Sequence, residues 1–367
     1  MKIPRILLAA GASGSGKTLI TCGLLQALVN RKKKVASFKC GPDYIDPMFH
    51  SRVIGTKSRN LDTFFTDADT TRYLLRRNAA DCDIAVMEGV MGFYDGVGGI
   101  STRASAYDLA DTTDTPVILI VNSRGMSISL AAYIKGFMEY KENSHIKGVI
   151  FNQMSSMLYP RMKKLVEEEL GIEVFGYVPK VEDCVIESRH LGLVLPEEIV
   201  DLKERLQKLA GVLEDTLEID RILALAENAP DLNAPESLSQ KNPAFDFHLP
   251  EKLRIGVAKD EAFCFFYADN FRMLQEMGAE LVEFSPVHDA HLPDNLDGIL
   301  LYGGYPELNG EALERNESMK TEIARAVNGG MPCIAECGGF MYLHERMEDM
   351  DGISRKTCGV IPGKCFR

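Results

Sequence analysis

An eight-residue motif near the N-terminus constrains the fold of this chain more than any other feature. Residues 11–18 read GASGSGKT and match G-x-x-x-x-G-K-[S/T], the pattern of a phosphate-binding loop between a strand and a helix. The apolar run Arg5–Ala10 precedes the loop and a helical stretch, Thr18–Asn30, follows it. The motif therefore predicts an α/β domain that holds a nucleotide at one edge of a mostly parallel sheet.

The residue types in this loop predict how it would hold ATP. Its glycines let backbone N–H groups point at phosphate oxygens, and the helix N-terminus adds partial positive charge. We expect Lys17 to neutralise the β and γ phosphates and the Thr18 hydroxyl to bind Mg²⁺. The predicted nucleotide-binding residues of the loop are Gly11, Ser13, Gly14, Ser15, Gly16, Lys17 and Thr18.

Short apolar runs alternate with helical stretches through the first half of the chain, which is typical of a P-loop NTPase-type sheet buried on both faces. The predicted strands are Arg5–Ala10, Val35–Lys39, Ile84–Met87, Val117–Val121, Gly148–Phe151 and Val174–Val178. The predicted helices are Thr18–Asn30, Ser127–Tyr140 and Tyr159–Leu170. A stretch rich in Pro, Asn, Ser and acid then indicates a linker. The predicted domains are residues 1–226 and 253–367, with the linker at 227–252.

Bulk properties narrow the function classes. The net charge is −12, which disfavours sequence-independent binding to nucleic acid. No apolar run reaches the roughly 18–20 residues that span a bilayer, so we expect no membrane partner. The nine cysteines form no CxxC pair, which favours a reducing cytoplasm.

Acidic residues follow two of the predicted strands at the edge where ligands bind. Glu88 comes directly after Ile84–Met87 and is a candidate Mg²⁺ ligand. Asp43 and Asp46 lie in the loop after Val35–Lys39, where they could bind Mg²⁺ or position a substrate. A plain turn built by the neighbouring prolines is the alternative for this second pair.

Four segments in order, GASGSGKT, KCGPDYIDP, MEGVMGFYDG and ESRHLGL, resemble the cobyrinic acid a,c-diamide synthase family. The resemblance runs from Lys2 to about Pro362. It implies a dethiobiotin-synthetase-like ATP domain joined to a class I glutamine amidotransferase domain, which is a flavodoxin-like α/β fold. It also implies amidation of the a and c acetate carboxylates of cobyrinic acid through an acyl phosphate, with ammonia supplied by glutamine.

The resemblance also implies roles for particular residues. Asp43, Glu88 and Asp95 would surround Mg²⁺, phosphate and the reacting carboxylate, with Asp43 and Asp95 catalytic. Tyr44 would lie beside the tetrapyrrole. Asn152, which ends a predicted strand, looks like the residue on the adenine side, although a turn-forming Asn is the alternative. Two further candidates for binding the carboxylate groups of the tetrapyrrole are Arg189 and His190, where a surface pair is the alternative.

The second domain contains a candidate nucleophile in the segment MPCIAECGGFMYLHERM. A short strand enters Cys337 and glycines lead into a helix, as in the turn that exposes a reactive side chain at a sheet edge. Cys337 would attack the glutamine amide and release ammonia. By resemblance, the backbone N–H groups of Gly303 and Gly304 would form the oxyanion hole.

A general base for Cys337 is not evident in this sequence. The family takes a histidine from a segment well after the cysteine, whereas the only later histidine here is His344, which we expect two turns along the following helix. We therefore expect an incomplete amidotransferase domain with weak or no glutaminase activity, while free ammonia feeds synthesis. Exposed apolar surface on that domain would favour self-association, for example as a homodimer.

Three alternatives stay open at this point. A nickel-sirohydrochlorin a,c-diamide synthase would carry the same motifs, and cobyric acid synthase fits KCGPDYIDP and EGVMGFYDG less well. A nucleotide-switch protein with a vestigial amidotransferase domain is the third. Its relatives among partition ATPases carry a lysine at the second position of the loop, where this chain has Ala12.

Overall fold

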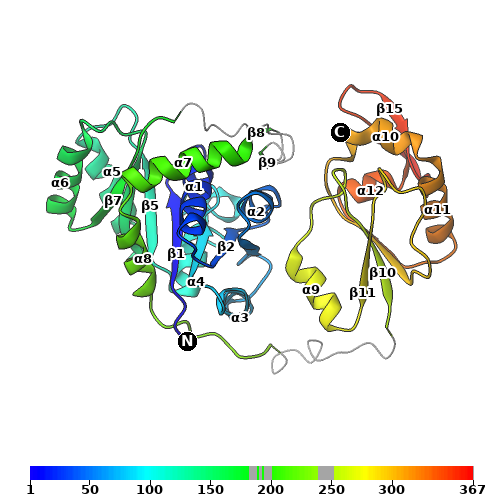
Figure 1. The fold of residues 1–367 in the computed structure, drawn as a ribbon, viewed down its shortest axis with the longest axis horizontal. Coiled ribbons are helices and arrows are strands. Elements are labelled where there is room, and N and C mark those ends of the chain that lie inside the picture. The colour runs from blue at the N-terminus through cyan, green and yellow to red at the C-terminus, as the bar shows by residue number, and fades with distance from the viewer. Residues whose placement is uncertain (182–187, 190–191, 194–200, 239–251, 367) are drawn as a thin grey trace. The chain divides into compact units, whose positions relative to one another are not determined.

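The computed structural model describes residues 1–181, 188–189, 192–193, 201–238 and 252–366. The chain divides into two compact units, Met1–Leu238 and Ser239–Arg367 (Figure 1). Each unit is described by itself. In the described residues, no helix is long and apolar enough to cross a membrane.

Unit 1 is built on a seven-stranded parallel sheet in the order β3-β2-β4-β1-β5-β6-β7. Its strands are β1 (Arg5–Ala10), β2 (Val35–Cys40), β3 (Lys57–Leu61), β4 (Ile84–Glu88), β5 (Val117–Asn122), β6 (Ile146–Asn152) and β7 (Glu173–Val178), with a short hairpin of β8 (Ser188–Arg189) and β9 (Gly192–Leu193). Its helices are α1 (Lys17–Asn30), α2 (Ile45–Met48), α3 (Ala68–Ala79), α4 (Ala106–Thr113), α5 (Ser129–Glu139), α6 (Tyr159–Leu170), α7 (Leu202–Thr216) and α8 (Ile219–Glu227), with a π-helical turn η1 (Phe49–Ile54) and a 3₁₀ turn η2 (Val97–Gly99).

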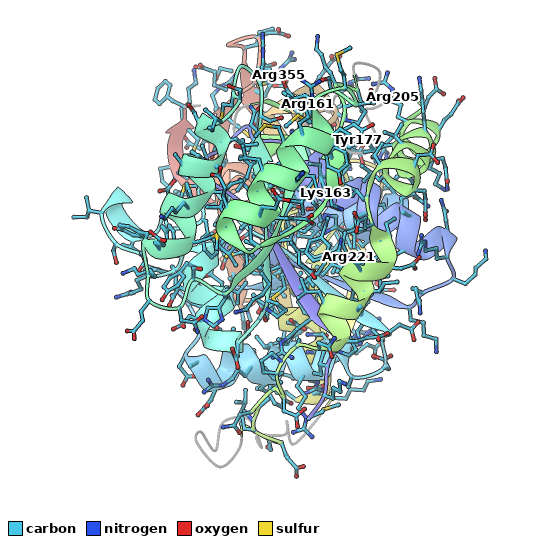
Figure 2. The ribbon with its side chains drawn as sticks, turned by 90° about the vertical axis from the view of Figure 1, so that its left-hand side faces the viewer. Arg161, Lys163, Tyr177, Arg205, Arg221 and Arg355 are labelled. Atoms are coloured by element: carbon cyan, nitrogen blue, oxygen red, sulfur yellow. The ribbon has the colours of Figure 1, made fainter. Side chains whose placement is uncertain are left out.

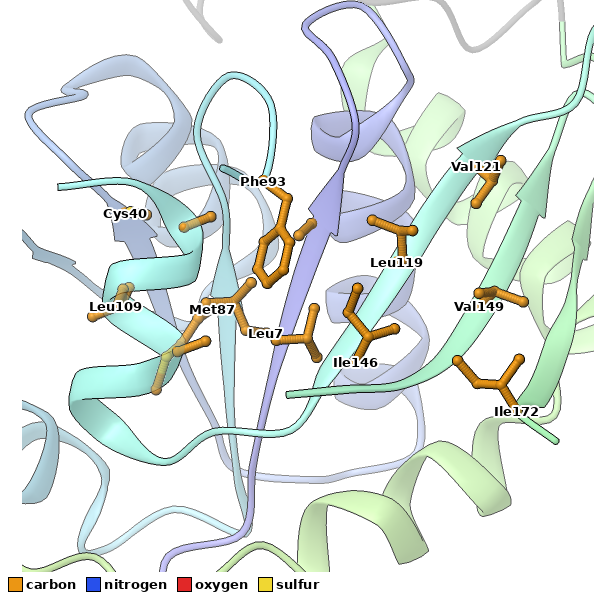
Figure 3. Packing of buried hydrophobic residues seen from close by; sticks show 14 of the residues in the cluster. Leu7, Cys40, Met87, Phe93, Leu109, Leu119, Val121, Ile146, Val149 and Ile172 are labelled. Atoms are coloured by element: carbon orange, nitrogen blue, oxygen red, sulfur yellow. The ribbon is translucent and has the colours of Figure 1, made fainter. Parts of the chain in front are cut away.

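The strands of unit 1 are apolar because helices cover both faces of the sheet. Leu7, Met87 and Leu119 face one core cluster together with side chains from α3 to α6 (Figure 3). The alternate residues of β1, such as Ile6 and Leu8, are equally buried, and α1, α7 and α8 contact the sheet or each other. This arrangement leaves the carboxyl ends of the strands, where the loops gather, for ligands.

All six strands predicted for this half of the chain are confirmed to within two residues at either end, as are the three predicted helices. The sequence pattern missed β3, whose residues KSRNL are mostly polar. This strand forms the edge of the sheet beside β2, where burial is incomplete and an apolar run is not required. The predicted mostly parallel α/β class is confirmed.

The segment after α8 belongs to unit 1 by its contacts. The Leu232 N–H donates to Met1 O at 2.9 Å, and Leu232 and Leu238 are buried. The sequence pattern begins a linker at residue 227, whereas the compact unit extends to Leu238. Residues 239–251 of the predicted linker lie outside the described residues.

Unit 2 has a four-stranded parallel sheet in the order β11-β10-β12-β13 and a three-stranded sheet in the order β15-β14-β16. Its strands are β10 (Arg254–Ala258), β11 (Glu280–Phe284), β12 (Gly298–Leu301), β13 (Cys333–Ala335), β14 (His344–Glu348), β15 (Ser354–Lys356) and β16 (Ile361–Cys365). Its helices are α9 (Ala268–Glu276), the 3₁₀ turn η6 (Pro306–Asn309), α10 (Gly310–Arg315), α11 (Glu317–Asn328) and α12 (Gly338–Tyr342).

The expectation that His344 lies two turns along a helix is wrong. Helix α12 has five residues and ends at Tyr342, and His344 is the first residue of β14. Strand β14 pairs with β15 and β16, so the segment HERME is held by strand partners instead of continuing the helix.

Candidate active sites

The loop Gly11–Gly16 joins the carboxyl end of β1 to the first residue of α1, as the motif predicted. Gly14 and Gly16 have φ angles of 73° and 91°, a region that residues with a Cβ rarely adopt. The Lys17 ammonium donates to the backbone oxygens of Ala12, at 3.3 Å, and Met91. Ser13 and Gly14 are exposed, so the loop backbone is open to a ligand.

Asn152, at the end of β6, contacts this loop from the side. Its side-chain amide donates to Ser15 O at 2.8 Å. A Cβ on Gly16 would lie only 2.3 Å from Asn152 Nδ2, so the close approach requires glycine there. Asn152 therefore supports the shape of the loop, and its expected place on the adenine side stays a prediction.

A buried charge cluster lies at the carboxyl ends of β2 and β4. The Thr18 hydroxyl donates to Glu88 Oε1 at 2.6 Å. The Lys39 ammonium donates to the same oxygen at 2.9 Å and to Asp46 Oδ2. Glu88 is fully buried, and Lys39 and Asp46 are almost so. The last residue of the phosphate-loop motif is therefore hydrogen-bonded directly to the buried carboxylate of Glu88.

The environment shifts the pKa of both acids. Burial, followed by the negative charge of Glu88, raises the pKa of Asp46 to about 8. Burial alone would raise the pKa of Glu88 as well, but Lys39 and His50 bring it well below its usual range. Glu88 is therefore the ionised partner that faces Thr18, and Asp46 takes up a proton more readily than a surface carboxyl does.

The sequence reasoning missed Lys39 and His50. The sequence predicts Lys39 as the last residue of a strand, with no role at the site. It pairs in register with Glu88 of β4, so the pairing of these adjacent strands explains the contact. His50 Nε2 lies 3.3 Å from Glu88 Oε2 and its ring is fully buried, with no hydrogen-bond partner on either nitrogen. His50 stands in the π-helical turn η1, which no sequence signal predicted.

The other two predicted acids lie beside the buried charge cluster and in the loop after β4. Asp43 Oδ1 accepts the N–H groups of Ile45 (2.9 Å) and Asp46 (3.1 Å) at the start of α2, and Asp43 Oδ2 is 3.9 Å from Lys39 Nζ. Asp95 Oδ2 accepts the Gly92 N–H at 3.0 Å in the loop after β4.

Of the three substrate-binding candidates, the structure describes the side chain of Tyr44 alone. Tyr44 immediately precedes α2, beside Asp43, and is half-buried. Arg189 lies in β8, but its side chain is outside the described part of the chain, and His190 is outside it altogether. The structure places Tyr44 next to Asp43 in the chain, and the substrate-binding roles of Tyr44, Arg189 and His190 stay predictions.

The donor set at the cluster fits Mg²⁺. Among the described residues no three His, Cys, Asp or Glu side chains form a ready metal cage, and Lys39 lies between the acids. Mg²⁺ does not need such a cage, because it is commonly held by one or two carboxylates together with substrate phosphates and water. Glu88 Oε2 is buried and lies 3.3 Å from His50 Nε2 without a well-formed hydrogen bond, so it is a hard oxygen that a cation could share with the His50 ring.

Unit 2 places Cys337 in a strained turn between β13 and α12. Its φ and ψ are 49° and −115°, and the side chain is exposed. Such backbone strain clusters at functional sites. A Cβ on Gly303 would lie 3.5 Å from Cys337 Sγ, so the predicted oxyanion-hole segment with Gly304 adjoins the thiol.

The three histidines described in unit 2 are bonded elsewhere. His288 contacts Glu261 at 2.8 Å, His291 contacts Glu322 at 2.6 Å, and His344 Nδ1 is 2.9 Å from Phe340 O. None of them is hydrogen-bonded to Cys337.

Comparison with known proteins finds a match for each part of the chain. Residues 6–193 match the CobQ/CobB/MinD/ParA nucleotide binding domain, and residues 254–365 match the CobB/CobQ-like glutamine amidotransferase domain. A cobyrinate a,c-diamide synthase of Dehalococcoides mccartyi (strain CBDB1) is 42% identical over 99% of this chain and 78% of its own length. The enzyme of that name from Caldanaerobacter subterraneus subsp. tengcongensis is 38% identical over 97% of this chain and 77% of its own length. MinD of Aquifex aeolicus is far more distant, at 14% identity and a TM-score of 0.36 over 63% of this chain and 99% of its own.

A nucleotide-binding unit joined to a glutamine amidotransferase unit defines an ATP-dependent carbon–nitrogen ligase with glutamine as amido donor. The chain belongs to the cobyrinate a,c-diamide synthase family.

Proposed function

We propose that this protein amidates the a and c acetate carboxylates of cobyrinic acid at the expense of ATP. The observation that carries the proposal is the hydrogen bond from Thr18, at the end of the phosphate-loop motif, to the buried carboxylate of Glu88. The same chain holds Cys337 in a strained turn, as a cysteine nucleophile requires. The names of the relatives supply the tetrapyrrole class.

The chemistry follows from the poor reactivity of a carboxylate toward ammonia. Transfer of the γ-phosphoryl group to a carboxylate oxygen gives an acyl phosphate and ADP. Ammonia then adds to the acyl carbon, and phosphate leaves as the amide forms. Such transfer depends on positioning and charge neutralisation, here by the loop amides and Lys17. Asp43 and Asp95 would orient the reacting carboxylate and ammonia.

Thr18, Glu88 and Asp43 would hold Mg²⁺, which supplies charge neutralisation for the transferring phosphate. In unit 2, the Cys337 thiol would attack the glutamine side-chain amide, releasing ammonia and leaving a glutamyl thioester that water hydrolyses. The N–H groups of Gly303 and Gly304 would stabilise the intermediate oxyanion.

The test is mass spectrometry of cobyrinic acid incubated with ATP, Mg²⁺ and either glutamine or ammonium. We expect a product with two amides and two ADP formed per tetrapyrrole. A parallel incubation with nickel-sirohydrochlorin tests the related synthase activity. If it is amidated in preference to cobyrinic acid, nickel-sirohydrochlorin is the substrate. ATP hydrolysis that is indifferent to any tetrapyrrole would refute ligase activity and favour a nucleotide switch.

A further inference from the structure

A cavity of about 550 Å³ opens beside the phosphate loop in unit 1. One wall is the segment 94–102, which follows β4, and the other is the α5 side from Ala132 to Tyr140. Gly11, the first residue of the loop motif, lines the cavity together with Asp95. The cavity therefore meets the expected position of the transferring phosphate.

The walls of this cavity are mostly aromatic. The ring centroids of Tyr94 and Phe137 are 5.7 Å apart, and these two rings are stacked. Tyr94 also contacts Tyr140, and Phe137 contacts Tyr133, each as a tilted pair with centroids 4.9 Å apart. The Tyr94 hydroxyl donates to Phe137 O at 2.7 Å, which fixes the segment after β4 to α5. Four rings thus form a continuous and internally braced surface, the kind that binds a flat conjugated ligand.

Tyr133 joins this surface to the phosphate loop. A Cβ on Gly11 would lie 1.7 Å from the Tyr133 hydroxyl, so the phenol rests directly over the glycine. A ligand that packs on the rings would consequently present its edge to the loop and to Asp95.

Two apolar side chains at the rim of the cavity are exposed to solvent. Ile100 is 97% exposed and Tyr140 is 65% exposed. Covering them would remove apolar area from water, which favours binding of a large apolar surface. The Lys141 ammonium lies 5.6 Å from the centre of the Tyr140 ring, where it could pair with a peripheral carboxylate.

We infer that this cavity, formed by Tyr94, Tyr133, Phe137, Tyr140 and Ile100, receives the ring system of the tetrapyrrole polycarboxylate, an inference that rests on the proposed function. One acetate arm reaches the loop beside Asp95, and another pairs with Lys141. The adenine base of ATP is the competing planar occupant. Its expected contact, Asn152, ends β6, whereas Asp95 follows β4 on the opposite side of β1 in the order β4-β1-β5-β6.

Equilibrium dialysis of the full chain against cobyrinic acid, followed by its absorbance, tests this inference. The variants are Tyr140→Ala and Ile100→Ser, both at exposed positions where folding is not at risk. We expect each to raise the Kd for cobyrinic acid, roughly fivefold to tenfold for loss of the ring, while the Kd for ATP changes less than about twofold. Phe366→Ala, at an equally exposed ring in unit 2, is the matched control and leaves both constants unchanged.

The outcomes separate this inference from the proposed function. Amide formation with an unchanged tetrapyrrole Kd in both variants would overturn the cavity assignment alone. A raised tetrapyrrole Kd with no amide formed by the wild type would support the cavity and overturn the proposed function. A raised Kd for ATP instead would assign the cavity to the adenine base. No binding of cobyrinic acid by the wild type would overturn both.

Discussion

The ammonium group of Lys39 is buried between Asp46 and Glu88, two acids that would otherwise repel each other. Removing one member of a buried ion pair leaves an uncompensated charge, which costs about 3–5 kcal/mol. We expect Lys39→Met to lower the stability of unit 1 by that amount. Scanning calorimetry of the full chain measures it as a shift of one unfolding transition.

Lys135→Met is the matched control, because Lys135 forms an exposed helical pair with Glu139 at 3.8 Å. Its effect should stay within about 0.5 kcal/mol. Equal shifts for the two variants would contradict the importance of the buried cluster.

At the scale of single residues, the acids were easier to predict than their partners. Glu88 and Asp43 follow strands whose apolar pattern is plain, so their meeting at one edge follows from parallel topology. His50 reaches Glu88 only because η1 winds as a π-helical turn, and nothing in FHSRVI indicates that geometry. The position of Asn152 against Ser15 likewise depends on a close approach that only the backbone at Gly16 permits.

At the scale of elements, the packing of α1 on α7 depends on a glycine. A Cβ on Gly23 would lie 2.6 Å from Leu213 Cδ1 and 2.8 Å from Leu209 Cγ. Overpacking of this kind costs about 1–3 kcal/mol, so we expect Gly23→Ala to destabilise unit 1. Urea denaturation of the full chain measures the change.

Gly211 supplies the comparison on α7, since it is exposed and a Cβ there would meet nothing within 4 Å. Gly211→Ala should stabilise the protein by about 0.5–1 kcal/mol because alanine loses less backbone entropy in a helix. A stabilising effect of Gly23→Ala, like the one expected for Gly211→Ala, would show that the two helices do not pack as described.

Glu218 at the start of α8 links this helix to α6. Lys163 of α6 and Arg221 of α8 lie on one side of unit 1 (Figure 2), and both donate to its carboxylate. Burial would raise the pKa of Glu218, but these two cations outweigh it and lower the pKa below the usual range. The carboxylate therefore adds stability above its unfolded pKa of about 4.3, and this stability disappears as the pH falls through the lower folded value.

We expect Glu218→Gln to lower the melting temperature at pH 7, by an amount equivalent to about 1 kcal/mol for such half-exposed pairs. The difference from wild type should shrink below about pH 4. Glu168→Gln, in the exposed pair with Lys164 at 3.7 Å, should show no comparable pH dependence. A difference that grows on acidification would have the wrong sign for a lowered pKa.

Most helices and strands could be predicted because their apolar residues recur with a clear period. Polar elements, and elements decided by tertiary contacts, could not be predicted in this way. Strand β3 is polar because it lies at the sheet edge, and its pairing with β2 is decided by the backbone. The short α12 ends where HERME pairs with two other strands. Strand pairing therefore overrides the helical pattern of this segment.

At the scale of the whole molecule, the two units divide the proposed reaction, and that division can be tested in one chain. Cys337→Ser should abolish any amidation supported by glutamine and leave the rate with ammonium unchanged. Lys17→Ala should reduce both rates by at least about 100-fold, because charge stabilisation of the transferring phosphate is lost. Mass spectrometry of the tetrapyrrole product measures all four rates.

Loss of ammonium-supported amidation in Cys337→Ser would contradict a role for this thiol confined to ammonia release. The overall plan behind this test, a nucleotide unit followed by an amidotransferase unit, was readable from two motifs. The tetrapyrrole-facing surface was not, because Tyr94, Tyr133, Phe137 and Tyr140 are separated in sequence and meet only when the segment after β4 folds against α5.

The sheet order has a consequence for biosynthesis. Strand β1 leaves the ribosome well before its hydrogen-bonding neighbours β4 and β5, which end at Glu88 and Asn122. At about 5–20 residues per second, translation delivers β5 roughly 5–20 s after β1. Over that interval the run RILLAA, which is wholly buried in the finished protein, lacks both neighbours until β4 has emerged and still lacks one of them until β5 follows. Nascent chains of this protein should therefore depend on a chaperone that shields short apolar segments until residue 122 has emerged.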